Sequence, residues 1–132
     1  MRDSHNAFHL AIPCRDLDEA QNFYVTQLGC HLARRYPDRV TLDFFGDQLV
    51  CHLTNQIEAQ SGLYPRHFGV TFYHRVEFDN LVRLATVREI PFFHAPVLRF
   101  EGRIEEHWTL ALIDPSFNIL EFKHYRDPRM MF

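Results

Sequence analysis

The order of strand-like and helix-like patterns most constrains this chain, because the same order runs through it twice. Each half begins with a short run of alternating apolar residues, continues with a segment of helical apolar spacing, and ends with three more strand-like runs. The halves cover about residues 7–54 and 67–125, and a polar segment with Gly and Pro joins them at about 55–66. Each half therefore predicts a β-α-β-β-β module, repeated in pattern but not in residue identity.

The predicted elements have definite bounds. Strands are expected at 7–14, 30–36, 40–45 and 48–54 in the first half and at 67–73, 92–100, 107–113 and 119–125 in the second. Asp16 is a plausible N-cap for a helix that ends at Gly29, and the second helix covers 77–90 before Pro91. The tail, 126–132, shows neither alternation nor a helical period. The pattern predicts a single domain of the α+β class over residues 1–132.

Composition excludes several classes of protein. The chain has 132 residues, is 46% apolar and contains 13 Phe, which is typical of a folded domain with a real core. A net charge of −3 with interspersed signs predicts no binding to nucleic acid, and no apolar run approaches the roughly 20 residues of a membrane span. The start, MRDSHNAF, lacks the apolar core of a secretory signal, and the three cysteines resemble buried, reduced thiols. We expect a cytoplasmic protein.

Three strand residues carry metal-ligand chemistry: His9, His67 and Glu121. Each alternates with apolar neighbours, so each is expected to point to the face opposite the apolar one. Two imidazoles and a carboxylate are the ligand set of a mononuclear metal site with open positions. An unpaired carboxylate inside a sheet face is costly to bury, which adds weight to Glu121. The sequence therefore predicts one divalent metal ion held by these three residues.

The closing run DPSFNILEF, at 114–122, resembles the DP-x-x-N-x-x-E-F signature of the vicinal oxygen chelate superfamily. That superfamily includes glyoxalase I, the extradiol dioxygenases and the fosfomycin and bleomycin resistance proteins. With the duplicated module order and the histidine that opens each half, the resemblance covers nearly the whole chain. It implies two modules that form a cupped, mixed β-sheet around a metal, with His9, His67 and Glu121 as ligands from the first and last strands of the halves.

His52, on the last strand of the first half, is expected to occupy the remaining symmetric position. In glyoxalase I-like members that position holds a fourth ligand, usually Glu, and this resemblance implies His52 as a fourth ligand for Zn²⁺ or Ni²⁺. In extradiol dioxygenases a second-shell histidine near that position serves as acid/base, which is the alternative role for His52. The spacing favours the dioxygenase arrangement, and a histidine can transfer protons near neutral pH. Those enzymes usually have a Tyr on the strand before the ligand Glu, where residues 110–112 are LAL. Tyr73 and Tyr125 are candidates to replace that Tyr.

The predicted function is a divalent-metal enzyme acting on a small substrate that chelates through neighbouring oxygens. Extradiol ring cleavage on Fe²⁺ is placed slightly ahead of a glyoxalase-like lyase or isomerase on Zn²⁺, Ni²⁺ or Mn²⁺. A non-catalytic binding protein, like the bleomycin-sequestering relatives, is the third alternative. Tyr73, Lys123 and Tyr125 are candidates for substrate binding, with an exposed rim as the equal alternative. Chains of two such modules commonly form homodimers, sometimes by exchanging modules, so His9 and His52 can belong to a different chain from His67 and Glu121.

Overall fold

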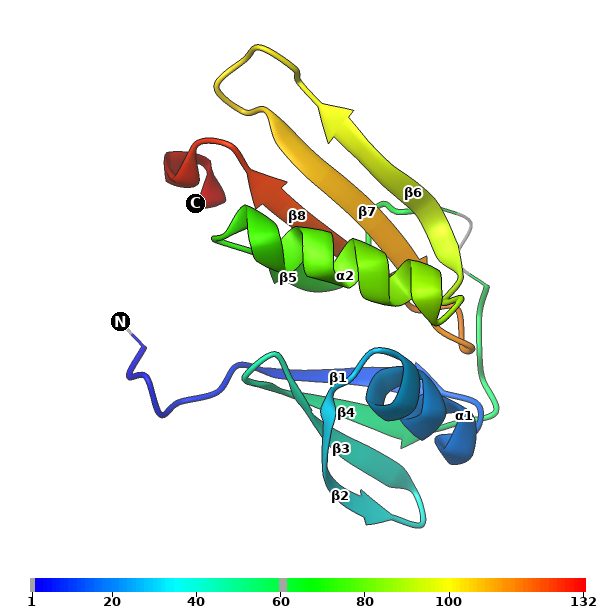
Figure 1. Cartoon of the computed structure of the whole chain (residues 1–132). Helices are drawn as coiled ribbons and strands as arrows, with labels where there is room; N and C mark the ends of the chain where they lie inside the picture. Colours follow the sequence, from blue (N-terminus) through cyan, green and yellow to red (C-terminus); the bar gives the residue numbers. More distant parts are fainter. Residues whose placement is uncertain (1, 60–61) are drawn as a thin grey trace. The chain divides into compact units, whose positions relative to one another are not determined.

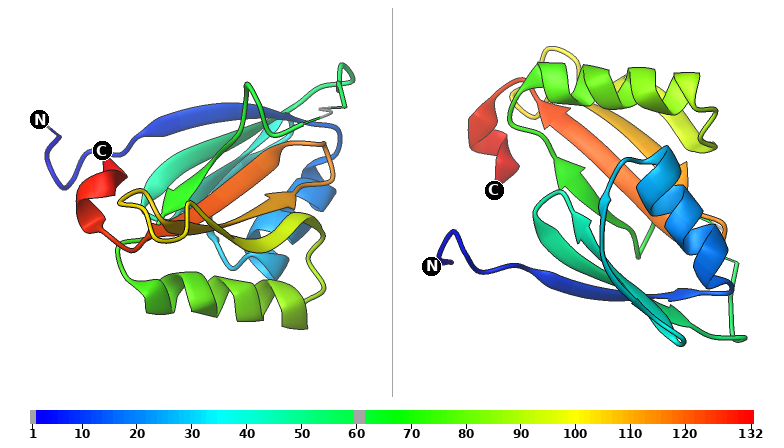
Figure 2. Two further views of the ribbon diagram at one scale, coloured as in Figure 1. Left: turned by 90° about the horizontal axis from the view of Figure 1, so that it is seen from above. Right: turned by 60° about the horizontal axis from the view of Figure 1, so that its bottom comes forward.

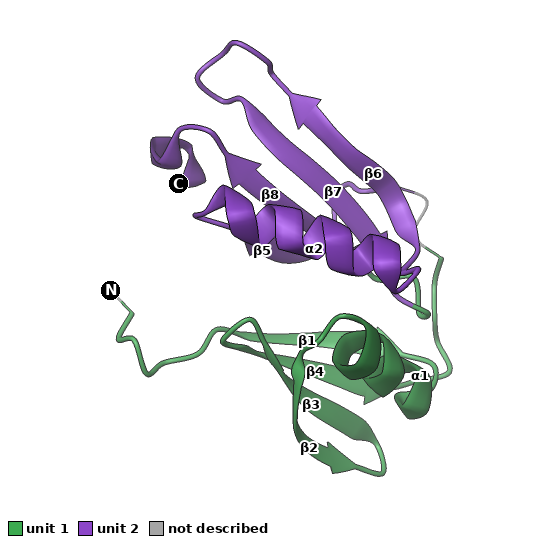
Figure 3. Cartoon of the chain, in the orientation of Figure 1, with its two compact units in different colours: residues 1–59, 115–118 green, residues 60–114, 119–132 purple. Residues whose placement is uncertain are grey.

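The computed structural model describes residues 2–59 and 62–132, so residues 60 and 61 of the predicted linker lie outside the described residues. The chain forms two compact units (Figure 3). Unit 1 contains residues 1–59 and 115–118, and unit 2 contains residues 60–114 and 119–132. The boundaries follow the two predicted modules except that 115–118, in the turn before the last strand, belongs to unit 1.

Both units contain a four-stranded mixed sheet with the same strand order (Figure 1). Unit 1 consists of β1 (His9–Cys14), α1 (Leu17–Gln21), the π-helix η1 (Asn22–Gln27), β2 (His31–Tyr36), β3 (Arg39–Phe44) and β4 (Asp47–Leu53), and its sheet order is β1-β4-β3-β2. Unit 2 consists of β5 (Phe68–Thr71), α2 (Arg75–Val87), β6 (Phe92–Arg99), β7 (His107–Ile113), β8 (Ile119–Tyr125) and the 3₁₀-helix η2 (Pro128–Met131), and its sheet order is β5-β8-β7-β6. In each sheet the first strand runs parallel to the last, and the other pairs are antiparallel. The duplicated β-α-β-β-β order and the α+β class are confirmed.

The alternation in the sequence has the expected structural result. In β8, Leu120 and Phe122 are fully buried on one face, and Glu121 between them points to the other face. In β4, Leu49 and Cys51 are buried in the same way. We call the face of each sheet that carries the predicted ligands its ligand face; the opposite face is apolar and packs against the unit's own helix.

The first helix differs from the prediction. Asp16 caps it as expected, accepting a hydrogen bond from the Glu19 amide at 2.8 Å. The α-helix ends at Gln21, however, and continues as a π-helix in which the Leu28 amide donates to the Phe23 carbonyl at 2.9 Å. The wider turn carries Phe23 and Tyr24, which are both buried with their ring centroids 4.8 Å apart.

The second helix, α2, lies along the apolar face of the unit 2 sheet and contacts β8 (Figure 2). Its buried residues are Phe78, Leu81 and Ala85, at the helical spacing that the sequence indicates. It runs from Arg75 to Val87 rather than over 77–90, because the His74–Glu77 capping box starts it earlier. Among the described helices, none has the length and apolar composition needed to cross a bilayer.

Candidate metal-ligand site

The ligand face of unit 2 is set by the register of its strands. Gly69 in β5 pairs with Glu121 in β8, and Ala111 in β7 pairs with Glu121 from the other side. A Cβ atom on Gly69 would lie 1.7 Å from the Glu121 carbonyl oxygen, so β5 approaches β8 at this level only because residue 69 has no side chain. The close approach brings the strand that follows His67 against the backbone of Glu121.

His67 and Glu121 form a direct contact. The Nε2 atom of His67 lies 2.8 Å from Oε2 of Glu121. The Glu121 side chain is 9% exposed and that of His67 is 24% exposed. His67 lies just before β5 rather than inside it, since β5 begins at Phe68 instead of at the predicted residue 67. Two of the three predicted ligands thus meet within one unit.

The partners of the His67 ring leave a place for a proton or a metal ion at this contact. Nδ1 lies 2.8 Å from the carbonyl oxygen of Leu63, which can only accept a hydrogen bond. Nε2 faces a carboxylate oxygen, which is also an acceptor when it is ionised. With Nδ1–H donating to Leu63, either a proton or a metal ion must lie between Nε2 and Oε2. A backbone carbonyl on the second nitrogen is also the usual partner of a metal-binding imidazole.

The second carboxylate oxygen of Glu121 is held separately. The hydroxyl of Thr109, in β7, donates a 2.8 Å hydrogen bond to Oε1. Thr109 is 2% exposed, so this is a buried bond. The carboxylate therefore has one oxygen bonded within the sheet and the other directed at His67.

The third predicted ligand, His9, lies in unit 1 at the start of β1 and is exposed. It pairs with Gln48 of β4, and its Nδ1 lies 2.5 Å from Oε1 of that side chain. With Nδ1 donating to the amide oxygen, Nε2 carries the lone pair that a metal needs. His9 therefore has the tautomer of a ligand, held by a side-chain carbonyl where His67 uses a backbone carbonyl.

The strand register gives His52 a different level from Glu121 when the two units are aligned. His9 and His67 each lie seven residues before the N-cap of their unit's first helix, which aligns the two units. In that alignment Glu121, paired with Gly69, corresponds to Val50, paired with Ala11. His52 pairs with Pro13, so it shares the ligand face with His9 but lies four residues, or about 13 Å, farther along the strand. The matching position therefore holds a buried valine, and the role of His52 remains a prediction.

The metal-ligand candidates are thus divided between the units. Within residues 2–59 and 62–132, no three His, Cys, Asp or Glu side chains gather closely enough to hold a metal ion. Unit 2 contributes His67 and Glu121, and unit 1 contributes His9. The donor set of the unit 2 pair, one imidazole nitrogen and one carboxylate oxygen with their other atoms bonded elsewhere, fits a borderline divalent cation.

The predicted substrate-binding residues fall into two groups. Lys123 and Tyr125 follow Glu121 on the ligand face of β8, and the Lys123 ammonium lies 5.5 Å from the centroid of the Tyr125 ring. His107, in β7, pairs with Tyr125 of β8, and their ring centroids are 4.7 Å apart. Tyr73, by contrast, lies beyond the end of β5, is 60% exposed and contacts the ring of His74. The structure brings Lys123 and Tyr125 to the same face as Glu121, whereas Tyr73 lies outside the sheet.

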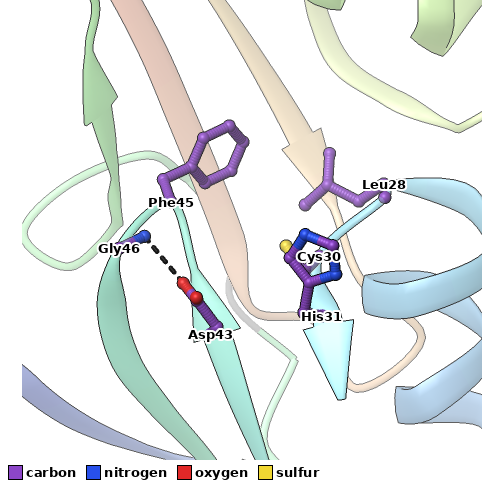
Figure 4. A pocket seen from close by; sticks show the side chains of 7 residues that line it. Leu28, Cys30, His31, Asp43, Phe45 and Gly46 are labelled. Atoms are coloured by element: carbon purple, nitrogen blue, oxygen red, sulfur yellow. Dashed lines mark hydrogen bonds between the residues drawn. The ribbon is translucent and has the colours of Figure 1, made fainter. Parts of the chain in front are cut away.

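A pocket in unit 1 is lined by residues of a different kind. Figure 4 shows Cys30, His31 and Asp43 around it, with the Asp43 carboxylate accepting from the Gly46 amide at 2.8 Å. Burial, and secondarily the nearby Asp43 charge, raises the pKa of the Cys30 thiol to about 12. The thiol is therefore protonated at neutral pH, as expected for a core cysteine rather than a nucleophile.

Two polar residues of the ligand faces were not identified from the sequence, Gln48 and Thr109. Each lies on the strand phase that points to the ligand face, which was the available signal. Their partners depend on the register between strands, which alternation alone does not reveal.

Comparison with known proteins agrees with this architecture. The Glyoxalase/Bleomycin resistance protein/Dioxygenase superfamily profile matches residues 7–122. A solved structure titled glyoxalase/bleomycin resistance protein/dioxygenase, from Alicyclobacillus acidocaldarius, is 64% identical over all of both chains, with a TM-score of 0.95. No curated protein matches the sequence.

More distant structures share the fold. The fosfomycin resistance protein FosX of Listeria monocytogenes is 11% identical, with 90% of this chain and 92% of that one covered and a TM-score of 0.70. The lactoylglutathione lyase of Agrobacterium tumefaciens is 18% identical, with 96% and 97% covered and a TM-score of 0.67.

Proposed function

Because the chain belongs to the glyoxalase/bleomycin resistance protein/dioxygenase superfamily, we propose that it is a divalent-metal-dependent enzyme acting on a small molecule. The proposed ligands are His67, Glu121 and His9. The contact between His67 and Glu121 is the observation that carries the proposal, since two groups with metal-ligand chemistry meet there and each has its other polar atom bonded elsewhere. Three protein ligands leave open positions at which two neighbouring substrate oxygens can bind.

The proposed chemistry is that of a Lewis acid. A divalent ion, when bound, polarises substrate oxygens and stabilises the negative charge that develops on them. The chain's own residues hold and orient the ligands: the Leu63 carbonyl holds His67, Thr109 holds Glu121, and Gln48 holds His9. Lys123, on the same face as Glu121, is placed to attract an anionic group of the substrate. A lyase or isomerase reaction on Zn²⁺, Ni²⁺ or Mn²⁺ fits this set.

Extradiol ring cleavage on Fe²⁺ is the second candidate, and it loses the narrow preference that the sequence gives it. That preference depends on His52 as the residue symmetric to Glu121, whereas the strand pair that aligns with Gly69–Glu121 is Ala11–Val50. What still favours it is that His52 is exposed on the ligand face of unit 1, where an acid/base histidine needs to be. A homodimer is proposed for either reaction.

The first experiment measures metal. The purified protein is stripped with a chelator, dialysed against Zn²⁺, Ni²⁺, Mn²⁺ or, without oxygen, Fe²⁺, and its metal content is determined by mass spectrometry. We expect one ion for each set of His9, His67 and Glu121, and a loss of at least about a hundredfold in affinity in Glu121→Ala and His67→Ala. His5→Ala, in the exposed N-terminal segment, is the matched control. Unchanged metal uptake in both ligand variants contradicts the proposal.

The second experiment separates the two reactions. Fe²⁺-loaded protein is tested for oxygen uptake over a panel of catechols, and Zn²⁺-, Ni²⁺- and Mn²⁺-loaded protein is tested on hemithioacetals of thiols and 2-oxoaldehydes. Oxygen uptake that His52→Ala abolishes supports ring cleavage. Turnover of hemithioacetals that His52→Ala leaves intact supports the lyase reaction. Sedimentation velocity gives the oligomeric state of the same samples.

A further inference from the structure

We propose that Thr109 is a positioning residue that limits Glu121 to one coordinating oxygen, and that it thereby sets both the affinity and the selectivity of the site for metals. The inference rests on the proposed metal-binding function and deepens it. It concerns a residue that touches neither the ion nor the substrate but acts through Glu121.

The geometry of β7 and β8 defines the contact. Ala111 pairs directly with Glu121, and Thr109 pairs with Lys123, so Thr109 lies diagonally from Glu121 on the same face. A diagonal neighbour is within reach of a long side chain, and the small Ala111 leaves the carboxylate room to turn toward Thr109. The result is the 2.8 Å bond from the Thr109 hydroxyl to Oε1.

Burial gives this bond its effect. Thr109 is 2% exposed and Glu121 is 9% exposed, so water does not compete for Oε1. An ionised carboxylate only accepts hydrogen bonds, and hence the hydroxyl donates and Oε1 is occupied. Oε2 is left to face His67 Nε2 at 2.8 Å. Glu121 is therefore arranged to bind an ion through one oxygen.

A one-oxygen carboxylate discriminates between ions. Zn²⁺ and similar ions accept four ligands of the nitrogen and oxygen type, whereas Ca²⁺ needs six to eight oxygens and often takes both oxygens of a carboxylate. Removing the hydroxyl releases Oε1 for the ion. We therefore expect the loss of Thr109 to weaken Zn²⁺ binding while it leaves Ca²⁺ binding unchanged or stronger.

The test compares Thr109→Val, which keeps the shape of the side chain but lacks the hydroxyl, with Thr109→Ser, which keeps the hydroxyl. Dissociation constants for Zn²⁺, Co²⁺ and Ca²⁺ are measured by competition with a chromophoric chelator. Urea unfolding of the metal-free proteins is measured in parallel. We expect Thr109→Val to bind Zn²⁺ and Co²⁺ about 10–100-fold more weakly and Thr109→Ser to stay near the wild type. The ratio of Zn²⁺ to Ca²⁺ affinity should fall by at least the same factor in Thr109→Val alone.

The outcomes are distinguishable. Zn²⁺ affinity within twofold of the wild type in Thr109→Val overturns the inference, as does an equal loss in Thr109→Ser. A lower stability of the metal-free protein with an unchanged affinity ratio also overturns it, because that result assigns Thr109 a structural role only. If the valine variant does not fold, Thr109→Ala replaces it with the same expectation. Glu121→Gln tests the proposed function separately. If Glu121→Gln binds metal with wild-type affinity, the proposed function is wrong. If Glu121→Gln loses metal binding but Thr109→Val does not, only the inference about Thr109 is wrong.

Discussion

The two units use one strand order to build two different ligand faces. In unit 2 the face carries a buried carboxylate, bonded to a buried hydroxyl and directed at an imidazole. In unit 1 the matching position holds Val50, 6% exposed, and the residue that aligns with His67 is the exposed His9. The comparison teaches that the duplicated scaffold determines where a ligand face lies, while the residues at each level decide whether it can hold a charge. The buried part of the proposed metal site is concentrated in unit 2.

The largest effect is expected at Gly69, whose counterpart in the unit 1 sheet, Ala11, is larger by one methyl group. Gly69 pairs with Glu121, and the corresponding Ala11 pairs with Val50. A Cβ at 69 would meet the Glu121 carbonyl at 1.7 Å, so Gly69→Ala must force β5 away from β8. We expect unit 2 to lose at least about 3 kcal/mol of stability, with loss of metal binding. Urea unfolding followed through the fluorescence of Trp108, the single tryptophan, measures it.

The matched control is Ala11→Gly, which tests the same level of the unit 1 sheet. A glycine within a strand is expected to cost only about 0.5–1 kcal/mol there. Similar losses in the two variants contradict the claim that the close approach is specific to β5 and β8.

The second prediction converts unit 1 toward unit 2. Val50→Glu places a carboxylate at the position equivalent to Glu121. Thr41 then lies directly opposite it, where unit 2 has Ala111, and Arg39 lies on the diagonal, where unit 2 has Thr109. The new carboxylate is buried, and Arg39 is already paired with Asp38, so we expect the free energy of unfolding to fall by about 3 kcal/mol in the absence of metal. Zn²⁺ should restore part of that loss, since His9 and the new carboxylate then resemble the pair in unit 2.

Val50→Met is the control, because it changes the volume of the side chain only modestly and adds no charge. Its expected cost is less than about 1.5 kcal/mol, without any effect of Zn²⁺ beyond that in the wild type. If Val50→Glu is as stable as Val50→Met in metal-free buffer, the carboxylate reaches water, and position 50 does not bury a charge as position 121 does.

Much of this architecture follows from alternation and spacing. The bounds predicted for β7 and β8 agree with the structure, and the pairing of His67 with Glu121 on one face follows from strand phase. The alternation of apolar residues shows which face of a sheet a side chain is on, but not how far along the strand it lies. For this reason the sequence predicts His52, rather than Val50, as the counterpart of Glu121. The π-helix at Asn22–Gln27 is not predicted either, because its residues have ordinary helical spacing.

The third prediction concerns the weaker support of His9. The His9–Gln48 bond is exposed, whereas the Thr109–Glu121 bond is buried. Water can replace the amide of Gln48, so Gln48→Leu is expected to weaken Zn²⁺ binding by only about two- to tenfold, at or below the low end for such supporting residues. Chelator competition measures it, and Gln48→Glu, which keeps an acceptor for Nδ1, should remain near the wild type. If Gln48→Leu loses as much Zn²⁺ affinity as Thr109→Val, then the exposure of the His9–Gln48 bond does not make it less important than the buried Thr109–Glu121 bond.

The smallest effect on metal binding at neutral pH is expected for the cysteine thiols of unit 1. All three cysteines lie in unit 1 and are buried, so reaction with a thiol reagent reports on unit 1 alone. Burial raises the Cys30 pKa from 9.0 to about 12, so at pH 8 the folded thiol has about a thousandfold less thiolate than in the unfolded chain. Reaction with Ellman's reagent should therefore be slow in buffer and fast in urea, and metal should not change it if the ion binds chiefly to unit 2.

The same shift has a definite sign in the pH dependence of stability. The unfolded thiol ionises above pH 9 while the folded thiol stays protonated until about pH 12, so stability from this group is present below pH 9 and is lost as the pH rises through that window. Cys30→Ala should flatten the loss between pH 9 and 12 without altering metal affinity at pH 7. An alkaline profile identical to the wild type would show that Cys30 reaches solvent in the folded state.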